Sequence, residues 1–223
     1  MMTRRFACAT RPACRALGIS LALLTRAGPS QAEDASLKFT DGVYGRFDGD
    51  LDISLAAGAM LVREGPAGAL LGRAFYLGTA GMYVAYTDSL GSSIPVPRSL
   101  GLGVALRPFF IPRWGYDLDR GPAILDLTID ATTFDLGVLW AADADGRFTQ
   151  LPGIELALGT EVPLAGQASG PWIGVRGVLR WRGSELASTE GIEDELQPAI
   201  FLTFAWHVLA NVHLVDANDR LFR

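Results

Sequence analysis

The chain has 223 residues, of which 49% are hydrophobic and 19% are charged, and its formal net charge at pH 7 is −5. An acidic chain without a basic patch does not match nucleic acid, so we exclude DNA and RNA as partners. Both cysteines, Cys8 and Cys14, precede residue 33. The rest of the chain therefore has no thiol for a disulfide framework, a nucleophile or a cysteine metal site.

Residues 1–32 have the features of a secretion signal. They contain five arginines and no acidic residue, followed by an apolar stretch, Ala16 to Leu24, that is too short to span a bilayer. Ser30-Gln31-Ala32 has the small-x-small form of a cleavage site, which places the mature start at Glu33. Removal of the signal would leave 14 basic and 24 acidic residues, a net charge of −10. Residues 33–47 form a polar lead-in without clear periodicity.

The segment 48–62 alternates between apolar and polar side chains. Leu51, Ile53 and Leu55 fall on one face, and Asp52 and Ser54 on the other. A period of two is typical of a β-strand whose two faces have different surroundings. The same pattern predicts further strands at 68–86, 100–106, 134–140, 154–164, 173–181 and 200–214. No stretch after residue 32 approaches the roughly 20 apolar residues of a membrane helix.

The segment 107–133 allows two interpretations. Gly121-Pro122 suits the start of a helix, because proline is accepted in a first turn. Residues 123–130 also alternate as a strand, and the change of phase at Ala131-Thr132-Thr133 suits a tight hairpin turn. We favour the hairpin, which gives eight strands. A helix would leave seven, and the missing strand would then come from the lead-in.

These patterns predict an all-β protein: a single antiparallel up-and-down β-barrel of about eight strands over residues 48–215, with a short helix near 120–131 as the alternative to one strand. A C-terminal tail covers 216–223. Tilted strands of about 9 to 11 residues are long enough to cross a bilayer.

The composition of the two strand faces indicates which face meets lipid. A sheet exposed to water carries many long charged side chains, especially lysine, whereas the only lysine here is Lys38, outside every predicted strand. The polar faces hold mainly small residues with isolated charges, which suits a narrow interior. The apolar faces carry aromatic residues near strand ends, as the aromatic girdles of membrane barrels do: Tyr76, Tyr86, Trp140, Trp181 and Trp206.

In this respect the chain resembles small bacterial outer-membrane barrels of the outer-membrane-protein A, X and W type. The resemblance covers about Asp48 to Leu214 and depends on the strand pattern, not on a motif. It implies a monomer in the outer membrane of a Gram-negative bacterium, with the lipid bilayer and the assembly machinery as partners and no cofactor. Family members commonly end on an aromatic residue, whereas Phe222 is penultimate here.

We predict a structural or interaction role, or a narrow porin-like pore, without catalysis. The alternatives are a soluble periplasmic barrel with apolar faces turned inward around an apolar ligand, and a lipid-modifying outer-membrane enzyme. The sequence offers little for such an enzyme. The histidines, His207 and His213, lie on the predicted inner face. Asp88-Ser89 supplies an acid and a hydroxyl group, but no matching histidine region completes a catalytic group with them. The acidic loop between Glu185 and Glu195 matches no calcium motif.

The predicted inner face carries charges of both signs, which we expect to form a structural network in the lumen: Arg73, Arg107, Asp135, Glu155, Glu161, Arg176, Arg180 and His207. Pairing strands 154–164 and 173–181 about the turn at 165–170 sets Glu155 opposite Arg180 and Glu161 opposite Gly174, with Arg176 diagonal to Glu161. We predict that these pairs plug the lumen.

The strand count also predicts the orientation. If the amino end starts in the periplasm, the turns after the second, fourth and sixth predicted strands are periplasmic. The segments 63–67, 109–121, 143–152 and 182–197 would then face outside, with external protease cutting near 190–195 rather than at 165–170.

Overall fold

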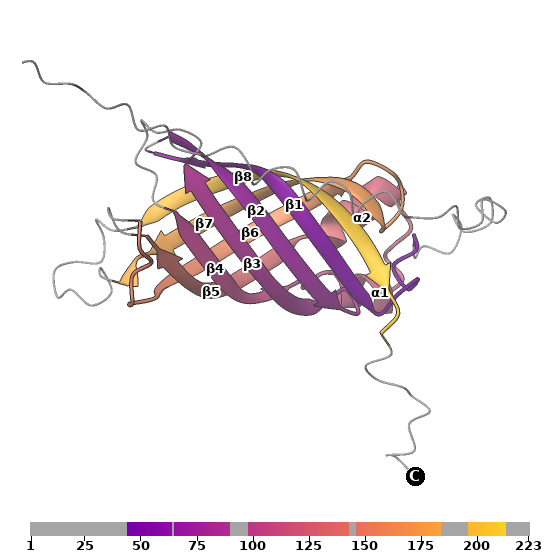
Figure 1. The fold of residues 1–223 in the computed structure, drawn as a ribbon. Coiled ribbons are helices and arrows are strands. Elements are labelled where there is room, and N and C mark those ends of the chain that lie inside the picture. The colour runs from indigo at the N-terminus through magenta and orange to yellow at the C-terminus, as the bar shows by residue number, and fades with distance from the viewer. Residues whose placement is uncertain (1–43, 64, 90–97, 143–145, 184–195, 213–223) are drawn as a thin grey trace, which may run out of the picture. The chain divides into compact units, whose positions relative to one another are not determined.

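The computed structural model describes residues 44–63, 65–89, 98–142, 146–183 and 196–212. Two short helices, α1 (Phe110–Gly115) and α2 (Ala123–Asp130), lie between the fourth and fifth strands (Figure 1). The eight strands are β1 (Leu51–Val62), β2 (Gly65–Tyr76), β3 (Ala80–Ser89), β4 (Ser99–Leu106), β5 (Thr133–Ala141), β6 (Gly153–Pro163), β7 (Gly170–Trp181) and β8 (Gln197–Ala210). The predicted signal 1–32, the tail 216–223, His213 and the acidic residues 185–195 lie outside the described residues.

The strands form one closed barrel in chain order. Each strand pairs antiparallel with the next, and β1 closes the barrel by pairing antiparallel with β8, from Leu51 opposite Ala210 to Leu61 opposite Ile200. Closure leaves no strand with an unpaired edge. The predicted antiparallel up-and-down barrel of eight strands is confirmed.

The strand faces point as the alternation requires, with apolar side chains outward. Every strand carries large apolar side chains that are at least 38% exposed, such as Leu55 in β1, Val104 in β4 and Val175 in β7. The inward positions are buried and include charged side chains such as Asp135 and Glu155, both 0% exposed. The apolar strand faces therefore point outward, and not inward as the soluble ligand-binding alternative requires.

Two of the predicted elements are wrong, and the errors cancel in the strand count. Residues 68–86 are not one strand but the hairpin β2–β3, which turns at 77–79. Residues 123–130 are not a strand but the helix α2, so the favoured hairpin is wrong and the helical alternative is right. In α2 the side chains of Asp126, Leu127 and Asp130 are buried, a helical spacing that the alternating pattern concealed. The eighth strand comes from 68–86 and not from the lead-in.

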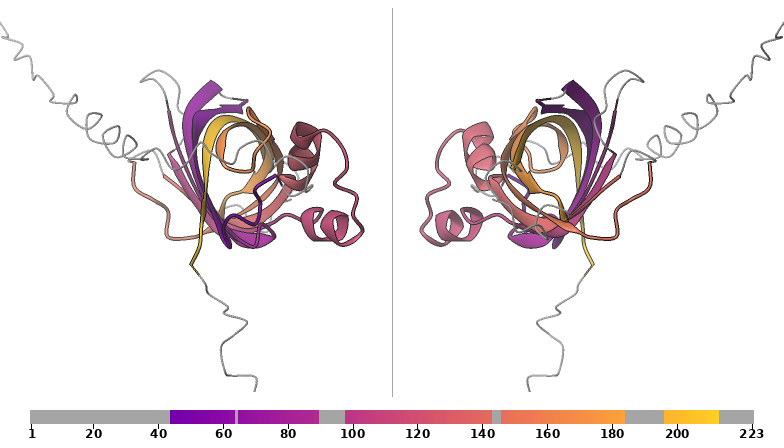
Figure 2. Two further views of the ribbon diagram at one scale, coloured as in Figure 1. Left: turned by 90° about the vertical axis from the view of Figure 1, so that its right-hand side faces the viewer. Right: turned by 90° about the vertical axis from the view of Figure 1, so that its left-hand side faces the viewer.

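The barrel has two ends of different character. The helical end comprises residues 44–50, the turn 77–79, the segment 107–132, the turn 164–169 and residues 211–212; Figure 2 shows the helices to one side of the barrel opening there. At the opposite end, the loop end, β1, β3, β5 and β7 finish and β2, β4, β6 and β8 begin. The segment 109–121 therefore lies at the same end as 165–170, contrary to the predicted orientation, because the missed hairpin shifted the order of the turns. No helix among the described residues is long and apolar enough to cross a membrane.

The β2–β3 turn holds a leucine in a strained conformation. Leu77 and Gly78 have φ angles of 47° and 63°, and the amide of Thr79 donates to the carbonyl of Tyr76 at 3.1 Å. Two central residues with positive φ are typical of a type I′ turn, which favours Asn-Gly.

We predict that Leu77→Asn stabilises the barrel. Asparagine tolerates this conformation, and the left-handed region costs a branched residue about 1 kcal/mol. Urea unfolding in detergent micelles should therefore show a higher midpoint for Leu77→Asn and a lower one for Gly78→Val. A lower midpoint for both variants would contradict the strain argument.

Candidate functional site

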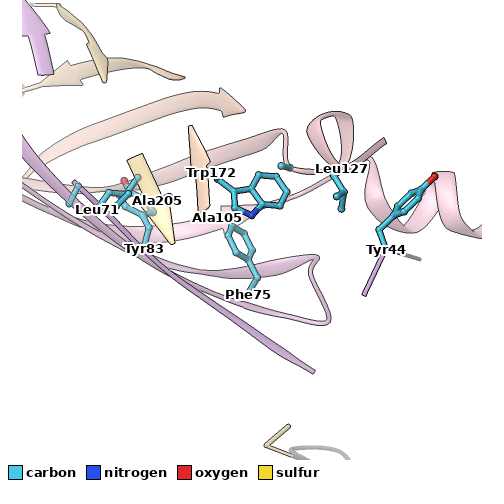
Figure 3. Packing of buried hydrophobic residues seen from close by; sticks show 11 residues of the cluster. Tyr44, Leu71, Phe75, Tyr83, Ala105, Leu127, Trp172 and Ala205 are labelled. Atoms are coloured by element: carbon cyan, nitrogen blue, oxygen red, sulfur yellow. The ribbon is translucent and has the colours of Figure 1, made fainter. Parts of the chain in front are cut away.

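Side chains fill the barrel interior, and they include two buried apolar clusters as well as charged residues. Figure 3 shows Phe75 and Trp172 between Tyr83 on one side and Leu127 on the other. The second cluster includes Met60, Val178 and Phe201. An eight-stranded barrel has an interior just wide enough to be filled in this way.

Glycines on the inward faces leave room for the larger polar side chains. A Cβ atom at Gly137 would lie 2.4 Å from the Tyr83 hydroxyl, and one at Gly174 would lie 3.0 Å from Cγ of Glu161. At Gly101, by contrast, a Cβ atom would lie 3.6 Å from either carboxylate oxygen of Glu155, an ordinary van der Waals contact. Glycine at positions 137 and 174 therefore leaves room for Tyr83 and Glu161.

Nine charged side chains form a continuous series of ion pairs, the luminal chain, which runs from the loop end toward the helical end. At the loop end, Arg180 Nε lies 2.8 Å from Glu155 Oε2. At the helical end, Arg107 Nη1 lies 2.5 Å from Asp52 Oδ2. The order is Arg180, Glu155, Arg176, Asp135, Arg73, Glu161, His207, Asp52 and Arg107, with successive groups 2.5–3.2 Å apart.

Charge alternates along this chain, so every carboxylate lies between two cationic groups. Glu155 lies between Arg180 and Arg176, for example, and Asp135 lies between Arg176 and Arg73. Each side chain in the series is at most 9% exposed. Removing charges from water is costly, and close pairing with hydrogen bonds offsets that cost.

His207 joins the two halves of the luminal chain through both ring nitrogens. Nδ1 lies 3.0 Å from Asp52 Oδ1, and Nε2 lies 2.9 Å from Glu161 Oε2. Because an ionised carboxylate only accepts hydrogen bonds, both nitrogens must carry a proton to donate. The geometry therefore assigns His207 as an imidazolium, which supplies the positive charge that alternation requires at this place.

Neutral side chains add hydrogen bonds and packing contacts to the luminal chain. The Tyr83 hydroxyl donates to Glu155 Oε1 at 3.0 Å, and Arg180 Nη1 donates to Ser99 Oγ at 3.3 Å. The guanidinium of Arg107 stacks on Phe75, with its carbon 3.9 Å from the ring centroid. Cation–π contacts of this kind are stronger where water is excluded.

The structure brings all eight predicted network residues into the luminal chain. Glu155 is paired with Arg180, and Glu161 with Gly174, at the register that the turn centre predicts. Glu161, however, contacts Arg73 and His207 and not Arg176, because side chains reach across the narrow lumen to strands that are not neighbours in the sheet. The ninth member, Asp52, is absent from the predicted network. Its place on the polar face of the first strand is the sequence feature that indicates an inward position.

A second ion-pair cluster, the helical-end cluster, joins the lead-in to the two helices. Arg113 lies 3.0 Å from Asp119 and 2.9 Å from Asp130, and Arg46 also pairs with both of these acids. Asp126 pairs with Arg113 at 2.5 Å and accepts a hydrogen bond from the Tyr44 hydroxyl at 3.0 Å. These contacts fix α1 and α2 against residues 44–46.

A small cavity of about 40 Å³ lies where the helical-end cluster meets the luminal chain. Arg46 and Asp130 line it on the side of the helices, and Asp52, Arg107 and His207 on the side of the lumen. This volume corresponds to a few water molecules at most. Among the described residues, no group of three histidine, cysteine or acidic side chains is arranged to hold a metal ion.

Comparison with solved structures finds barrels of low sequence identity. The crystal structure of Acinetobacter baumannii CarO2 is 12% identical, with a TM-score of 0.39 over 70% of this chain and 99% of that one. A de novo designed transmembrane β-barrel is 12% identical, with a TM-score of 0.34 over 72% and 96%. The solution structure of the designed protein TMB2.3 is 11% identical, with a TM-score of 0.35 over 72% and 94%. No protein-family model and no curated protein matches the chain.

The pH dependence of the helical-end cluster should report on Asp130. Burial, together with the carboxylates of Asp119 and Asp126, raises the pKa of Asp130 to about 6 against the opposing effect of Arg46 and Arg113. A carboxyl whose pKa is raised on folding stabilises the fold at low pH and loses this contribution as pH rises through about 6.

We therefore predict that Asp130→Asn gains stability relative to the wild type as pH rises. The neutral amide avoids the unfavourable ionisation of the buried carboxyl. The difference in unfolding midpoint between the two proteins should grow from pH 5 to pH 7, measured by urea unfolding at each pH. A difference that stays constant with pH would show that Asp130 ionises normally.

A double-mutant cycle should measure the coupling within the luminal chain. Arg180→Ala removes one of the two cations at Glu155, and breaking a buried pair in this way costs about 3 kcal/mol. Adding Glu155→Ala should recover part of the loss, measured as the free energy of unfolding in micelles. The exposed pair Arg98–Asp88, with side chains 46% and 40% exposed, provides the control, since Arg98→Ala should cost less than about 1 kcal/mol. Equal losses at both sites would contradict a desolvated network.

Proposed function

We propose that this chain is an outer-membrane β-barrel of a Gram-negative bacterium, with a structural or interaction role and a lumen closed by the luminal chain. One observation carries the proposal. Among the described residues of the eight strands, the outward positions carry no charged side chain except Asp88, next to last in β3. A wall in water needs charged side chains, whereas a wall in lipid excludes them.

The strand lengths and aromatic residues support the same conclusion. Strands of 8 to 14 residues match the thickness of a hydrocarbon core. Aromatic side chains lie on the outer face near both ends: Tyr86, Trp140 and Trp181 at the loop end, and Tyr76, Phe134 and Trp206 at the helical end. Two girdles of this kind mark the interfaces of a membrane barrel.

The closed interior favours a structural or interaction role over a pore or an enzyme. The luminal chain and the apolar clusters fill the lumen, so any passage is narrow. His207 is 2% exposed and its ring nitrogens contact carboxylates, an arrangement without a nucleophile for it to activate. Asp88 and Ser89 lie at the loop end, whereas His207 lies near the helical end, so they do not form a shared catalytic group.

The orientation and partners follow as part of the proposal. The described residues closest to both chain ends lie at the helical end, and we assign this end to the periplasm. The N-terminal signal and the outer-membrane assembly machinery would deliver a monomer to the membrane, with the loops after β3, β5 and β7 outside. The resemblance to the A, X and W type remains a prediction.

A single substitution on the outer wall tests the membrane assignment. Val175 is 46% exposed at the middle of β7. In lipid, Val175→Arg should cost roughly 2–4 kcal/mol and reduce the heat-modifiable barrel band in outer-membrane fractions, whereas Val175→Leu should assemble normally. In a water-soluble barrel of this structure the arginine would be solvated and harmless. Normal assembly of Val175→Arg, with recovery of the protein without detergent, would refute the proposal.

The closed lumen is tested by conductance. In planar bilayers the wild type should conduct weakly, and Arg180→Ala should conduct more because the variant removes a side chain that fills the loop end of the lumen. Arg98→Ala leaves the lumen unchanged and serves as the control. High conductance of the wild type itself would show that the luminal chain does not close the passage.

A further inference from the structure

The segment between β4 and β5 has its apolar side chains on the outside and most of its charges on the inside. Ile111 and Trp114 of α1 are 55% and 54% exposed, and Ile124 and Leu125 of α2 are 48% and 53% exposed. The charged side chains of Arg113, Asp119, Asp126 and Asp130 are turned into the helical-end cluster. A connection surrounded by water has the opposite arrangement, with apolar groups buried and charges exposed.

The two most exposed charges of this segment neutralise each other. Asp117 and Arg120 have side chains 72% and 76% exposed and form an ion pair three residues apart. The outer surface of the segment therefore carries apolar and aromatic groups with one neutral ion pair. Such a surface matches the boundary between lipid tails and headgroups, where tryptophan and tyrosine collect.

The position of α2 joins this surface to the lipid-facing wall. The hydroxyl of Thr160, on the outward face of β6, donates to the carbonyl of Thr128 in α2 at 2.8 Å. The same face of β6 carries Leu158 and Val162, which are 61% and 39% exposed. Figure 2 shows both helices beside the barrel and not across its opening. The apolar surface thus continues from the wall of the barrel onto the helices.

We propose that α1 and α2 form an interfacial anchor that lies in the lipid headgroup region at the helical end of the barrel. This inference rests on the proposed membrane location and adds a second lipid-contacting element to it. The helices contribute aromatic and aliphatic side chains to the interface, and the helical-end cluster fixes them to residues 44–46. Interfacial helices bind lipid in this way, with the apolar face buried in the headgroup boundary.

Site-directed spin labelling tests the anchor on the full chain, with Cys8→Ser and Cys14→Ser, in phosphatidylcholine vesicles. Single cysteines replace Ile111 and Ile124 on the proposed anchor, Asp117 as the charged reference position in the same segment, and Val175 as the lipid reference. Collision of the nitroxide with oxygen reports lipid, and collision with a nickel chelate reports water. The oxygen-to-nickel ratio should be severalfold higher at Ile111→Cys and Ile124→Cys than at Asp117→Cys, and highest at Val175→Cys.

The results distinguish failure of the anchor from failure of the membrane assignment. Water-like ratios at Ile111→Cys and Ile124→Cys, with a lipid-like ratio at Val175→Cys, would overturn the anchor and leave the barrel in the membrane. A water-like ratio at Val175→Cys would overturn the membrane location itself. Ratios at the anchor that depend on the amount of protein per lipid would show that a second copy covers the helices, which also overturns the proposal.

A measurement without labels guards against local disturbance by the nitroxide. Lipids brominated near the headgroup quench the fluorescence of tryptophan at the interface. The quenched fraction should be smaller for Trp114→Phe than for the wild type, since Trp114 lies on the proposed anchor. An unchanged quenched fraction would place Trp114 outside the headgroup region and overturn the anchor.

Discussion

The structure depends on the pairing of opposite charges inside the barrel, whose interior is too narrow for water to solvate them. Four carboxylates in the lumen each lie between two cationic groups, and alternation continues from Arg180 to Arg107. An order of signs that did not alternate would place two buried like charges side by side. The outer wall and the inner network are therefore two parts of one arrangement, with apolar side chains outward and paired charges within.

The strand pattern predicts much of this arrangement, because the direction of each side chain and the register across a short turn depend on residues close together in the sequence. Alternation identifies the inward and outward positions of each strand, and a short turn fixes the register of its two strands, as at Glu155 and Arg180. Contacts across the lumen are not local in this sense. Arg73 meets Glu161 at a separation of 88 residues, between strands that are not neighbours, so neither spacing nor turn geometry indicates the pair.

The two wrong elements have physical causes in the same pattern. The β2–β3 turn occupies three residues, so Tyr76 and Ala80 keep the same phase and the alternation continues through the turn. Its Leu77-Gly78 centre also lacks the asparagine or aspartate that marks such turns. In α2, Asp126 and Asp130 alternate with apolar residues but are buried by arginines, one of which, Arg46, lies far away in the sequence. The local signature of this helix is therefore limited to its start at Gly121-Pro122, because the arginine that neutralises Asp130 from residue 46 is not visible in the local pattern.

The bridge formed by His207 has a consequence for the order of folding. Asp52 belongs to the first strand of the barrel and His207 to the last, 155 residues apart, and these two strands pair with each other only when the sheet closes. Before closure the two groups are separated, and Glu161 and Asp52 lack their shared cation. The final strand pairing and the final charge neutralisation therefore occur in one step. This makes closure cooperative, because a partly closed sheet lacks both and is less stable than the closed barrel.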